Sequence, residues 1–119
     1  MQPEQFVSAL KQVVEDNSID DVLINISKLS GTKIDHRLKY LISWHNDLDI
    51  EGQQCVKEII KEAVSTTLFG LFCVFDGVRA IEDGPNRGSL ELYYVKDGNK
   101  LLLNDINEEF LHDIYKSLE

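Results

Sequence analysis

The sequence contains no run of about 20 apolar residues, the length that a helix needs to cross a lipid bilayer. Its first ten residues, MQPEQFVSAL, also lack the basic region and the apolar stretch of a secretory signal. We therefore expect a cytoplasmic protein that does not span a membrane.

Basic residues are few. Twelve Lys and Arg stand against 21 Asp and Glu, which gives a formal net charge of −9. Nucleic-acid binding requires a basic patch to neutralise phosphates, and binding to anionic lipid requires charge of the same sign. The composition therefore argues against nucleic acid and the membrane surface as partners. It permits a basic protein partner, whose encounter the acidic charge would speed. The alternative is that the acidity only confers solubility.

Residues for covalent or metal chemistry are also scarce. The two cysteines, Cys55 and Cys73, lie 18 positions apart and form no CxxC motif, so we expect neither a zinc site nor a disulfide. No G-x-S-x-G nucleophile motif occurs. The neighbouring carboxylates Glu82 and Asp83 cannot face each other as an acid–base pair. We therefore predict a protein that is not an enzyme and holds no cofactor, with an uncharacterised small enzyme as an alternative.

Apolar residues at helical spacing predict about four helices in the first half of the chain. These helices cover residues 3–16, 18–31, 32–45 and 56–64. Pro3 suits a first helical turn, Ser18 begins a capping pattern, and Gly31 is a typical helix end. A second capping pattern runs from Thr32 to Asp35. Residues 46–52, between the last two helices, form an acidic joint.

The densest apolar run, Leu68–Phe75, predicts a central strand because both of its faces would be apolar. Asp76 and Gly77 follow this run, and an Asp-Gly pair is a strong two-residue hairpin signal. We therefore expect a first β-hairpin over Leu68–Asp83.

A second β-hairpin is predicted further along the chain. Residues 90–95 alternate between apolar and polar positions, and an Asp-Gly pair at 97–98 returns the chain along residues 100–104. This register places Tyr94 opposite Leu101, which pairs apolar with apolar.

A last helix over residues 105–118 completes the plan. The predicted fold class is α+β in one domain, residues 1–119: N-terminal helices (about four), a four-stranded antiparallel β-meander and a C-terminal helix. In size, charge and this architecture the chain is similar to the small acidic immunity proteins with which bacteria neutralise their own toxins, and no motif carries the likeness. The resemblance implies that the chain binds a basic toxin domain.

The acidic joint also resembles a calcium-binding loop. Asp47, Asp49, Glu51, Gly52 and Glu58 follow the pattern D-x-[DN]-x-[DN]-G-x5-E at every position except Glu51. Alternate carboxylates in such a loop converge on one cation. A calcium-binding regulatory domain is therefore the second functional hypothesis. The alternative for this segment is an acidic helix N-terminus that Asp49 caps.

The leading hypothesis is a non-catalytic module that binds a basic protein. The predicted contact residues are Asp47, Asp49, Glu51, Glu82, Asp83 and Tyr93. The five carboxylates would attract the partner, and Tyr93 would be an aromatic anchor of the kind that is enriched at interface hot spots. A homo-oligomer is compatible with each hypothesis.

Overall fold

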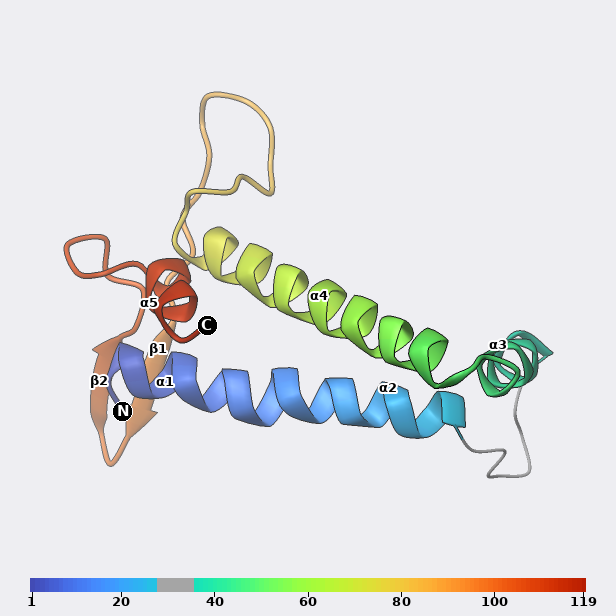
Figure 1. Ribbon diagram of the computed structural model, residues 1–119. Helices are drawn as coiled ribbons and strands as arrows, with labels where there is room; N and C mark the ends of the chain where they lie inside the picture. The colour runs from blue at the N-terminus through green and yellow to red at the C-terminus, as the bar shows by residue number, and fades with distance from the viewer. Residues whose placement is uncertain (28–35) are drawn as a thin grey trace. The chain divides into compact units, whose positions relative to one another are not determined.

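The computed structural model describes residues 1–27 and 36–119 (Figure 1). Their contacts divide the chain into two compact units. The hairpin unit comprises Met1–Val14 and Thr66–Glu119, and the helical unit comprises Glu15–Ser65. The predicted helix end at Gly31 and the capping pattern at 32–35 lie outside the described residues. That the chain is a single domain stays a prediction.

Helix α1 (Pro3–Leu10), the π-helical segment η1 (Lys11–Asp16) and helix α2 (Asn17–Ser27) follow one another without a break (Figure 1). Pro lies in the first turn of α1, and the side chains of Gln2 and Gln5 form a reciprocal capping box there. The predicted start of a new helix at Ser18 is wrong. A π-helical turn contains more residues than an α-helical turn, so the spacing of the apolar residues shifts at η1 although the backbone stays helical. This shift in spacing resembles the start of a new helix.

Helix α3 (His36–Asn46) is followed by the long helix α4 (Ile50–Phe75). The predicted strand Leu68–Phe75 is wrong, because these residues form the last turns of α4. The polar residues before them do not end the helix: the Ser65 hydroxyl donates to the Glu62 carbonyl oxygen at 3.3 Å, within the helix itself. A uniformly apolar run has no alternation that would distinguish a strand from a buried helix.

The pair Asp76-Gly77 ends α4 instead of turning a hairpin. Gly77 has a φ of 77°. Its N–H donates to the Val74 carbonyl at 3.1 Å, and the N–H of Val78 donates to the Cys73 carbonyl at 3.0 Å. These two bonds form a Schellman motif, in which glycine adopts the same positive φ that a hairpin turn requires. The first hairpin is therefore absent, and residues 76–92 form neither helix nor strand.

The second hairpin is confirmed. Strands β1 (Tyr93–Lys96) and β2 (Asn99–Leu102) pair antiparallel, with Tyr94 opposite Leu101. Asp97 and Gly98 both have positive φ, 53° and 78°, as the favoured two-residue turn requires. Within the described residues the sheet has only these two strands. The four-stranded meander is thus contradicted, and the fold is mixed α/β and mostly helical.

The last helix, α5 (Leu111–Ser117), is shorter than the predicted 105–118. Its expected first turn is replaced by a local turn, because the Asp105 carboxylate accepts the backbone N–H of Asn107 at 2.9 Å. An Asp side chain that bonds the backbone two residues ahead competes with a helical start.

The hydrophobic core of the hairpin unit joins α1, the end of α4 and α5. Its buried members are Val7, Leu68, Phe72, Leu111, Ile114 and Tyr115. Phe72 lies at its centre: its ring meets Phe6 edge-on at 6.4 Å and Tyr115 at 5.4 Å between centroids. The helical unit buries less. Of its described apolar side chains only Ile19 and Ile42 are buried.

No helix in the described parts of the chain combines the length and the apolar character needed to span a bilayer.

We predict that Phe72→Ala lowers the free energy of unfolding by about 3–5 kcal/mol, because it empties a fully buried ring site. The matched control is Leu71→Ala, whose side chain is 44% exposed and which we expect to cost about 1 kcal/mol or less. Urea unfolding measures both. A strand with two buried faces would make the two substitutions similarly costly, so equal losses would contradict the helical assignment.

Candidate binding loop and acidic joint

One buried asparagine holds both ends of the long loop that follows α4. Asn104 Nδ2 donates to the carbonyl oxygens of Phe75 at 2.6 Å and Leu90 at 2.9 Å. Its Oδ1 accepts the N–H of Leu92 at 2.9 Å. Asn104 is 8% exposed, and buried backbone groups need hydrogen-bond partners. The Asn104 side chain supplies the partners that a neighbouring strand would otherwise provide. The loop therefore has a fixed base.

A buried carboxylate attaches α5 to the same base. Asp76 accepts the backbone N–H of Leu111 at 3.0 Å and that of His112 at 2.9 Å. The His112 ring donates from Nδ1 to the same carboxylate at 2.6 Å. Phe110, which directly precedes α5, provides no side-chain cap, so Asp76 supplies the missing cap from 35 residues away.

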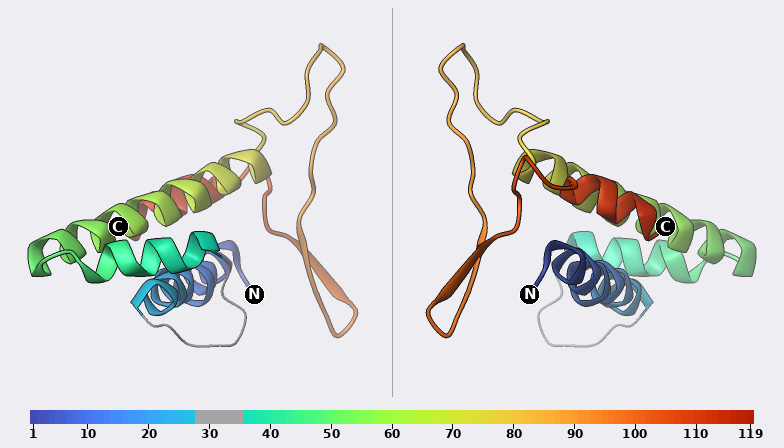
Figure 2. Two further views of the ribbon diagram at one scale, coloured as in Figure 1. Left: turned by 90° about the vertical axis from the view of Figure 1, so that its right-hand side faces the viewer. Right: turned by 90° about the vertical axis from the view of Figure 1, so that its left-hand side faces the viewer.

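Beyond this base the loop lies open to solvent. Every residue from 77 to 91 is exposed, and Figure 2 shows this stretch extending beyond the end of α4. Two internal contacts shape it: the Glu82 carboxylate accepts the N–H of Gly88, and Arg87 Nε donates to the Gly84 carbonyl at 2.9 Å. Long loops without regular structure are uncommon in compact proteins and are often functional. We call residues 77–91 the binding loop.

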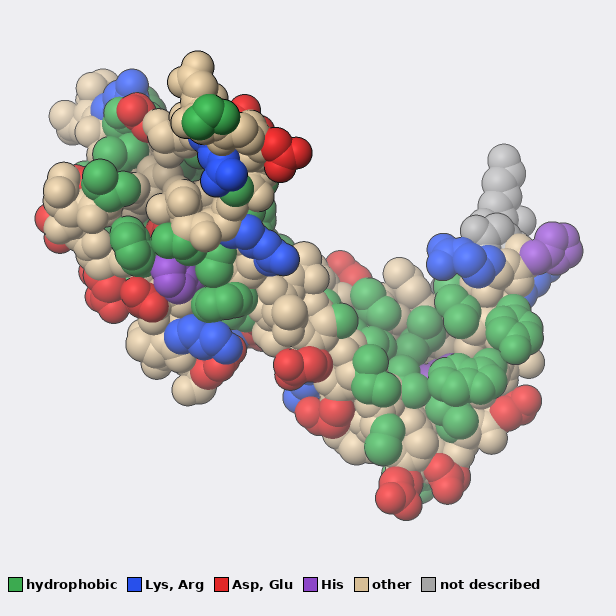
Figure 3. Space-filling model, turned by 90° about the horizontal axis from the view of Figure 1, so that it is seen from above, with side chains coloured by type: hydrophobic (Ala, Val, Ile, Leu, Met, Phe, Trp, Pro, Cys, Tyr) green, Lys and Arg blue, Asp and Glu red, His purple; other side chains and the backbone are tan. Residues whose placement is uncertain are grey.

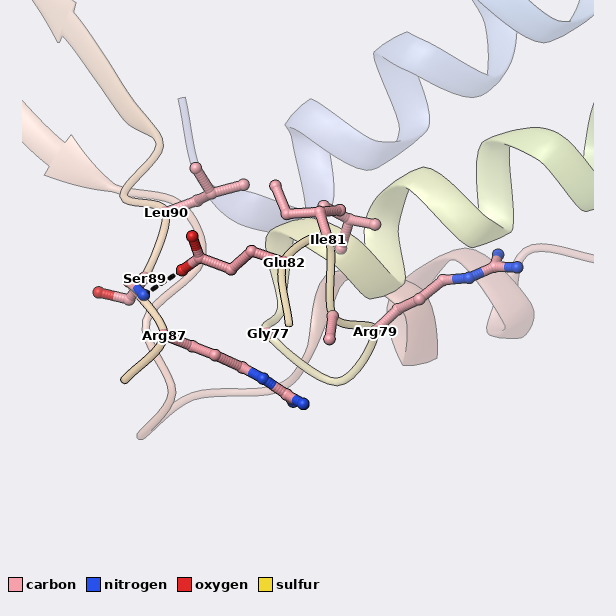
Figure 4. A pocket seen from close by; sticks show the side chains of 10 residues that line it. Gly77, Arg79, Ile81, Glu82, Arg87, Ser89 and Leu90 are labelled. Carbon is pink, nitrogen blue, oxygen red and sulfur yellow. Dashed lines mark hydrogen bonds between the residues drawn. The ribbon is translucent and has the colours of Figure 1, made fainter. Parts of the chain in front are cut away.

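The binding loop encloses a hollow of about 400 Å³ against the end of α4 (Figure 4). Its lining residues from the binding loop are Gly77, Arg79, Ala80, Ile81, Glu82, Arg87, Gly88, Ser89 and Leu90, and Val74 completes it. Its volume lies in the range of small-molecule sites. Its lining combines apolar residues with the side chains of Arg79, Glu82 and Arg87, and the end of the Arg79 side chain points away from it along α4.

Tyr93 stands on the exposed face of β1. Its hydroxyl donates to Glu91 at 2.7 Å, and Lys100 Nζ lies 4.0 Å from its ring centroid. The hydrogen bond to the Glu91 carboxylate raises the pKa of the Tyr93 phenol. The side chain is thus held in place while 37% exposed, as an aromatic anchor would be.

The carboxylates of the acidic joint do not converge on one point in the structure. Asp49 Oδ1 accepts the N–H of Gly52 at 2.7 Å, so Asp49 caps α4 as the alternative expected. Glu58 lies two turns further along α4 and pairs with Gln54 and Lys61. Among the described residues no group of three or more acidic, His or Cys side chains is placed to hold a metal ion.

Two aromatic side chains precede the acidic joint. Tyr40 and Trp44 are 71% and 48% exposed, and their spacing of four residues puts them on one face of α3. The neighbouring His45 is buried, and its Nδ1 has no hydrogen-bond partner. Figure 3 shows hydrophobic side chains gathered over one face of the helical unit, at the lower right. This unit therefore presents apolar area next to acidic side chains.

Neither Cys73 nor His112 has the surroundings of a catalytic nucleophile or of its base. Burial and, next, the Asp76 carboxylate raise the pKa of the Cys73 thiol, which is the opposite of what a reactive cysteine needs. His112 Nε2 faces Asp113 at 3.4 Å, and its Nδ1 is occupied by Asp76. The Asp76–His112 pair is accounted for by its role in fixing α5 to the end of α4.

The predicted contact residues fall into two groups. Asp47, Asp49 and Glu51 belong to the helical unit, whereas Glu82, Asp83 and Tyr93 belong to the hairpin unit. Glu82 and Asp83 lie in the binding loop, not at the end of a hairpin. Sequence reasoning missed the roles of Asp76 and Asn104 and did not single out Arg79. No periodicity links Asn104 to Phe75, because their contact spans 29 residues.

Comparison with protein-family models, with curated proteins and with solved structures finds no match for this chain.

We predict that Asn104→Ala releases the binding loop, because three backbone groups lose their partner. The free energy of unfolding should fall by about 2–3 kcal/mol, and trypsin should cut more quickly after Arg79 and Arg87. Asn107→Ala removes an exposed amide that bonds only Asp105, and it serves as the control. Identical cleavage rates in the two variants would show that Asn104 does not hold the loop.

We predict that Glu91→Gln moves the pKa of Tyr93 down toward its ordinary value. A phenol that donates to a carboxylate loses that bond when it ionises, so the carboxylate raises the pKa, and a neutral amide removes most of this effect. NMR titration of labelled tyrosine measures it, with Tyr94 as the internal reference. An unchanged Tyr93 titration would mean that the contact with Glu91 is not formed in solution.

Proposed function

We propose that this chain is a non-catalytic module that binds a basic protein through the helical unit. The observation that carries the proposal is the exposed aromatic pair on α3, Tyr40 and Trp44, directly followed by the acidic joint. Tyrosine and tryptophan provide much contact area for little lost conformational freedom and are enriched among the residues that dominate binding energy.

The acidic joint supplies the charge. Asp47, Asp49 and Glu51 are exposed, and neither Asp47 nor Glu51 forms an ion pair within the described residues. Three carboxylates in five positions, on a chain of net charge −9, attract a basic surface over several ångströms. Rim charges of this kind act mainly on the association rate, whereas buried aromatic anchors act on the dissociation rate.

The small core of the helical unit supports the same proposal. Several of its large apolar side chains are exposed: Val22, Ile24, Tyr40, Trp44, Ile50 and Ile59. Apolar surface of this extent next to charged residues is typical of interaction sites. A basic protein that covers it would bury apolar area that the unit leaves in water.

The likeness to immunity proteins now rests on size and charge, because the sheet of the described residues has two strands and not the four of the meander. We keep a basic toxin domain as one source of the partner and the cytoplasm as the compartment. Two free cysteines, Cys55 and Cys73, suit a reducing compartment. No observation on the described residues favours the calcium hypothesis, so we do not carry it further.

We predict that the purified chain captures a basic protein from its host and that two variants weaken this capture differently. Asp47→Asn with Glu51→Gln should lower the association rate about tenfold at low salt and leave dissociation nearly unchanged. Tyr40→Ser should raise the dissociation rate about tenfold. Surface plasmon resonance with the captured partner separates the two effects.

The matched control is Ile106→Ser, a substitution at a similarly exposed apolar residue of the hairpin unit. It should leave both rates unchanged. A partner that binds wild type, Tyr40→Ser and the charge variant equally would overturn the proposal, and so would the capture of no basic protein. A chain that captures only its own copies would replace the proposal with a homo-oligomer.

A further inference from the structure

Three aspartates of this chain are directly followed by glycine: Asp76, Asp83 and Asp97. An Asp-Gly pair can react with itself, because the backbone nitrogen of the glycine can attack the side-chain carbonyl carbon of the aspartate. A side chain on the following residue would crowd this attack, and glycine has none. The two atoms must also meet in the right orientation. The fold therefore decides which of these pairs reacts.

The pair at the end of α4 is blocked at both reacting groups. The Asp76 carboxylate is 1% exposed and accepts the backbone N–H groups of Leu111 and His112 at 3.0 and 2.9 Å. The attacking nitrogen is engaged as well, since the Gly77 N–H donates to the Val74 carbonyl at 3.1 Å. Ring closure would break the end of α4 and the attachment of α5 together. We expect Asp76 to react only when this part of the chain opens.

The pair in the hairpin is held by its turn. Lys96 pairs with Asn99 on either side of it, and Asp97 and Gly98 both have positive φ. In such a two-residue turn the first central residue has a ψ of about 30°, which keeps the next backbone nitrogen away from its side chain. Attack requires this peptide plane to rotate, and the rotation disrupts the turn that joins the strands. The hairpin therefore slows the reaction at Asp97.

The pair in the binding loop meets neither constraint. The loop extends beyond the end of α4, and Asp83 and Gly84 are exposed within it (Figure 2). In the described parts of the chain the Asp83 carboxylate forms no ion pair, and the Gly84 N–H has no backbone partner. The two contacts that shape the loop use the Glu82 side chain and the Gly84 carbonyl, which are not the reacting groups. The Asp83 side chain and the Gly84 nitrogen are thus free to meet.

We propose that Asp83 is the site of a spontaneous covalent modification, its conversion to isoaspartate. The Gly84 nitrogen forms a bond to the side-chain carbonyl carbon of Asp83, and the carboxyl hydroxyl leaves with the amide hydrogen as water. Water then opens the resulting succinimide ring. Cleavage between the nitrogen and the original main-chain carbonyl leaves the chain running through the side-chain carbonyl, with the old main-chain carbonyl as a free carboxylate. Cleavage of the other bond restores aspartate.

The modified loop is suited to one class of enzyme. Isoaspartate inserts a methylene group into the main chain and presents a carboxylate where a peptide carbonyl was. A protein-isoaspartate carboxyl methyltransferase moves the methyl group of S-adenosylmethionine to an oxygen of such a carboxylate, and S-adenosylhomocysteine leaves. The binding loop is exposed while Asn104 holds its ends, so the enzyme can reach it without unfolding the chain. This role is separate from the proposed capture of a basic protein, because the loop belongs to the hairpin unit.

Ageing of the folded chain tests the proposal. The purified chain is kept at physiological pH and temperature, and its digests are analysed by liquid chromatography with mass spectrometry, which separates isoaspartyl from aspartyl peptides of equal mass. We expect isoaspartate to accumulate at Asp83. It should form about a hundredfold more slowly at Asp76, because the hydrogen bonds to its carboxylate must break first. At Asp97 it should form about tenfold more slowly, because a two-stranded hairpin opens more easily.

Two controls separate the effect of the fold from that of the local sequence. Short synthetic peptides that each span one pair should react at similar rates, because none of them is folded. Purified methyltransferase with labelled S-adenosylmethionine should label the aged chain. Asp83→Glu should remove most of this label at unchanged charge, since a glutamate must close a larger ring and reacts far more slowly. The matched variant Asp97→Glu should keep the label.

Several results would overturn the inference. Equal rates at all of the Asp-Gly pairs in the folded chain would show that the fold does not select Asp83. An unreactive Asp83 in a chain whose matching peptide reacts would show that the loop holds the two groups apart. Peptide rates that already follow the order seen in the protein would assign the selection to local sequence. Label that persists in Asp83→Glu would place the isoaspartate elsewhere.

Discussion

The hairpin unit depends on the way one carboxylate ends one helix and begins another. The backbone N–H of Asp76 still makes a helical hydrogen bond to the carbonyl of Phe72 at the end of α4. The Asp76 side chain accepts the first N–H groups of α5. Both oxygens are used, and the side chain is almost wholly buried, at 1% exposure. A buried carboxylate is tolerated only when it is fully hydrogen-bonded, and here three donors meet that condition. The packing of Leu111 and Tyr115 against Phe72 follows from this attachment.

The same physical requirement explains Asn104. A two-stranded sheet leaves many backbone groups of neighbouring segments without partners, and buried ones must find them elsewhere. Asn104 offers both donors and an acceptor on one planar group, which allows it to serve Phe75, Leu90 and Leu92 together. Side chains therefore take the place that a third and a fourth strand would have filled.

The two Asp-Gly pairs show how far the sequence could predict this fold. Both pairs need glycine at positive φ, at Gly77 and at Gly98. The second follows an alternating segment, so its hairpin and its register were predictable. The first follows a uniformly apolar run, for which a helix C-terminus and a strand end have the same local requirements. The residues upstream decide between helix and strand for this run, because α4 is helical from Ile50 onward and continues through it.

The candidate sites also differ in how far local sequence could predict them. The local helical pattern is enough to predict the exposure of Tyr40, the acidic joint and the cap at Asp49. The hollow could not be predicted in this way, because it exists only if residues 76–92 form no regular structure and Asn104 holds the two ends of the loop together. Both conditions depend on contacts between segments far apart in the sequence. Glu82 illustrates the difference: its carboxylate accepts the N–H of Gly88, six residues further along a loop without regular structure, and no local pattern predicts that contact.

Asn104 also makes the binding loop a separable part of the molecule. A single amide nitrogen donates to the carbonyl oxygens of Phe75 and Leu90, so those two oxygens cannot be farther apart than the sum of the two bond lengths. The chain leaves and re-enters the folded unit at almost one point. A loop with such close ends can change its length or its sequence at little entropic cost to the rest of the protein. The hairpin unit is therefore suited to carry foreign peptides between these two residues, as a scaffold for grafted sequences.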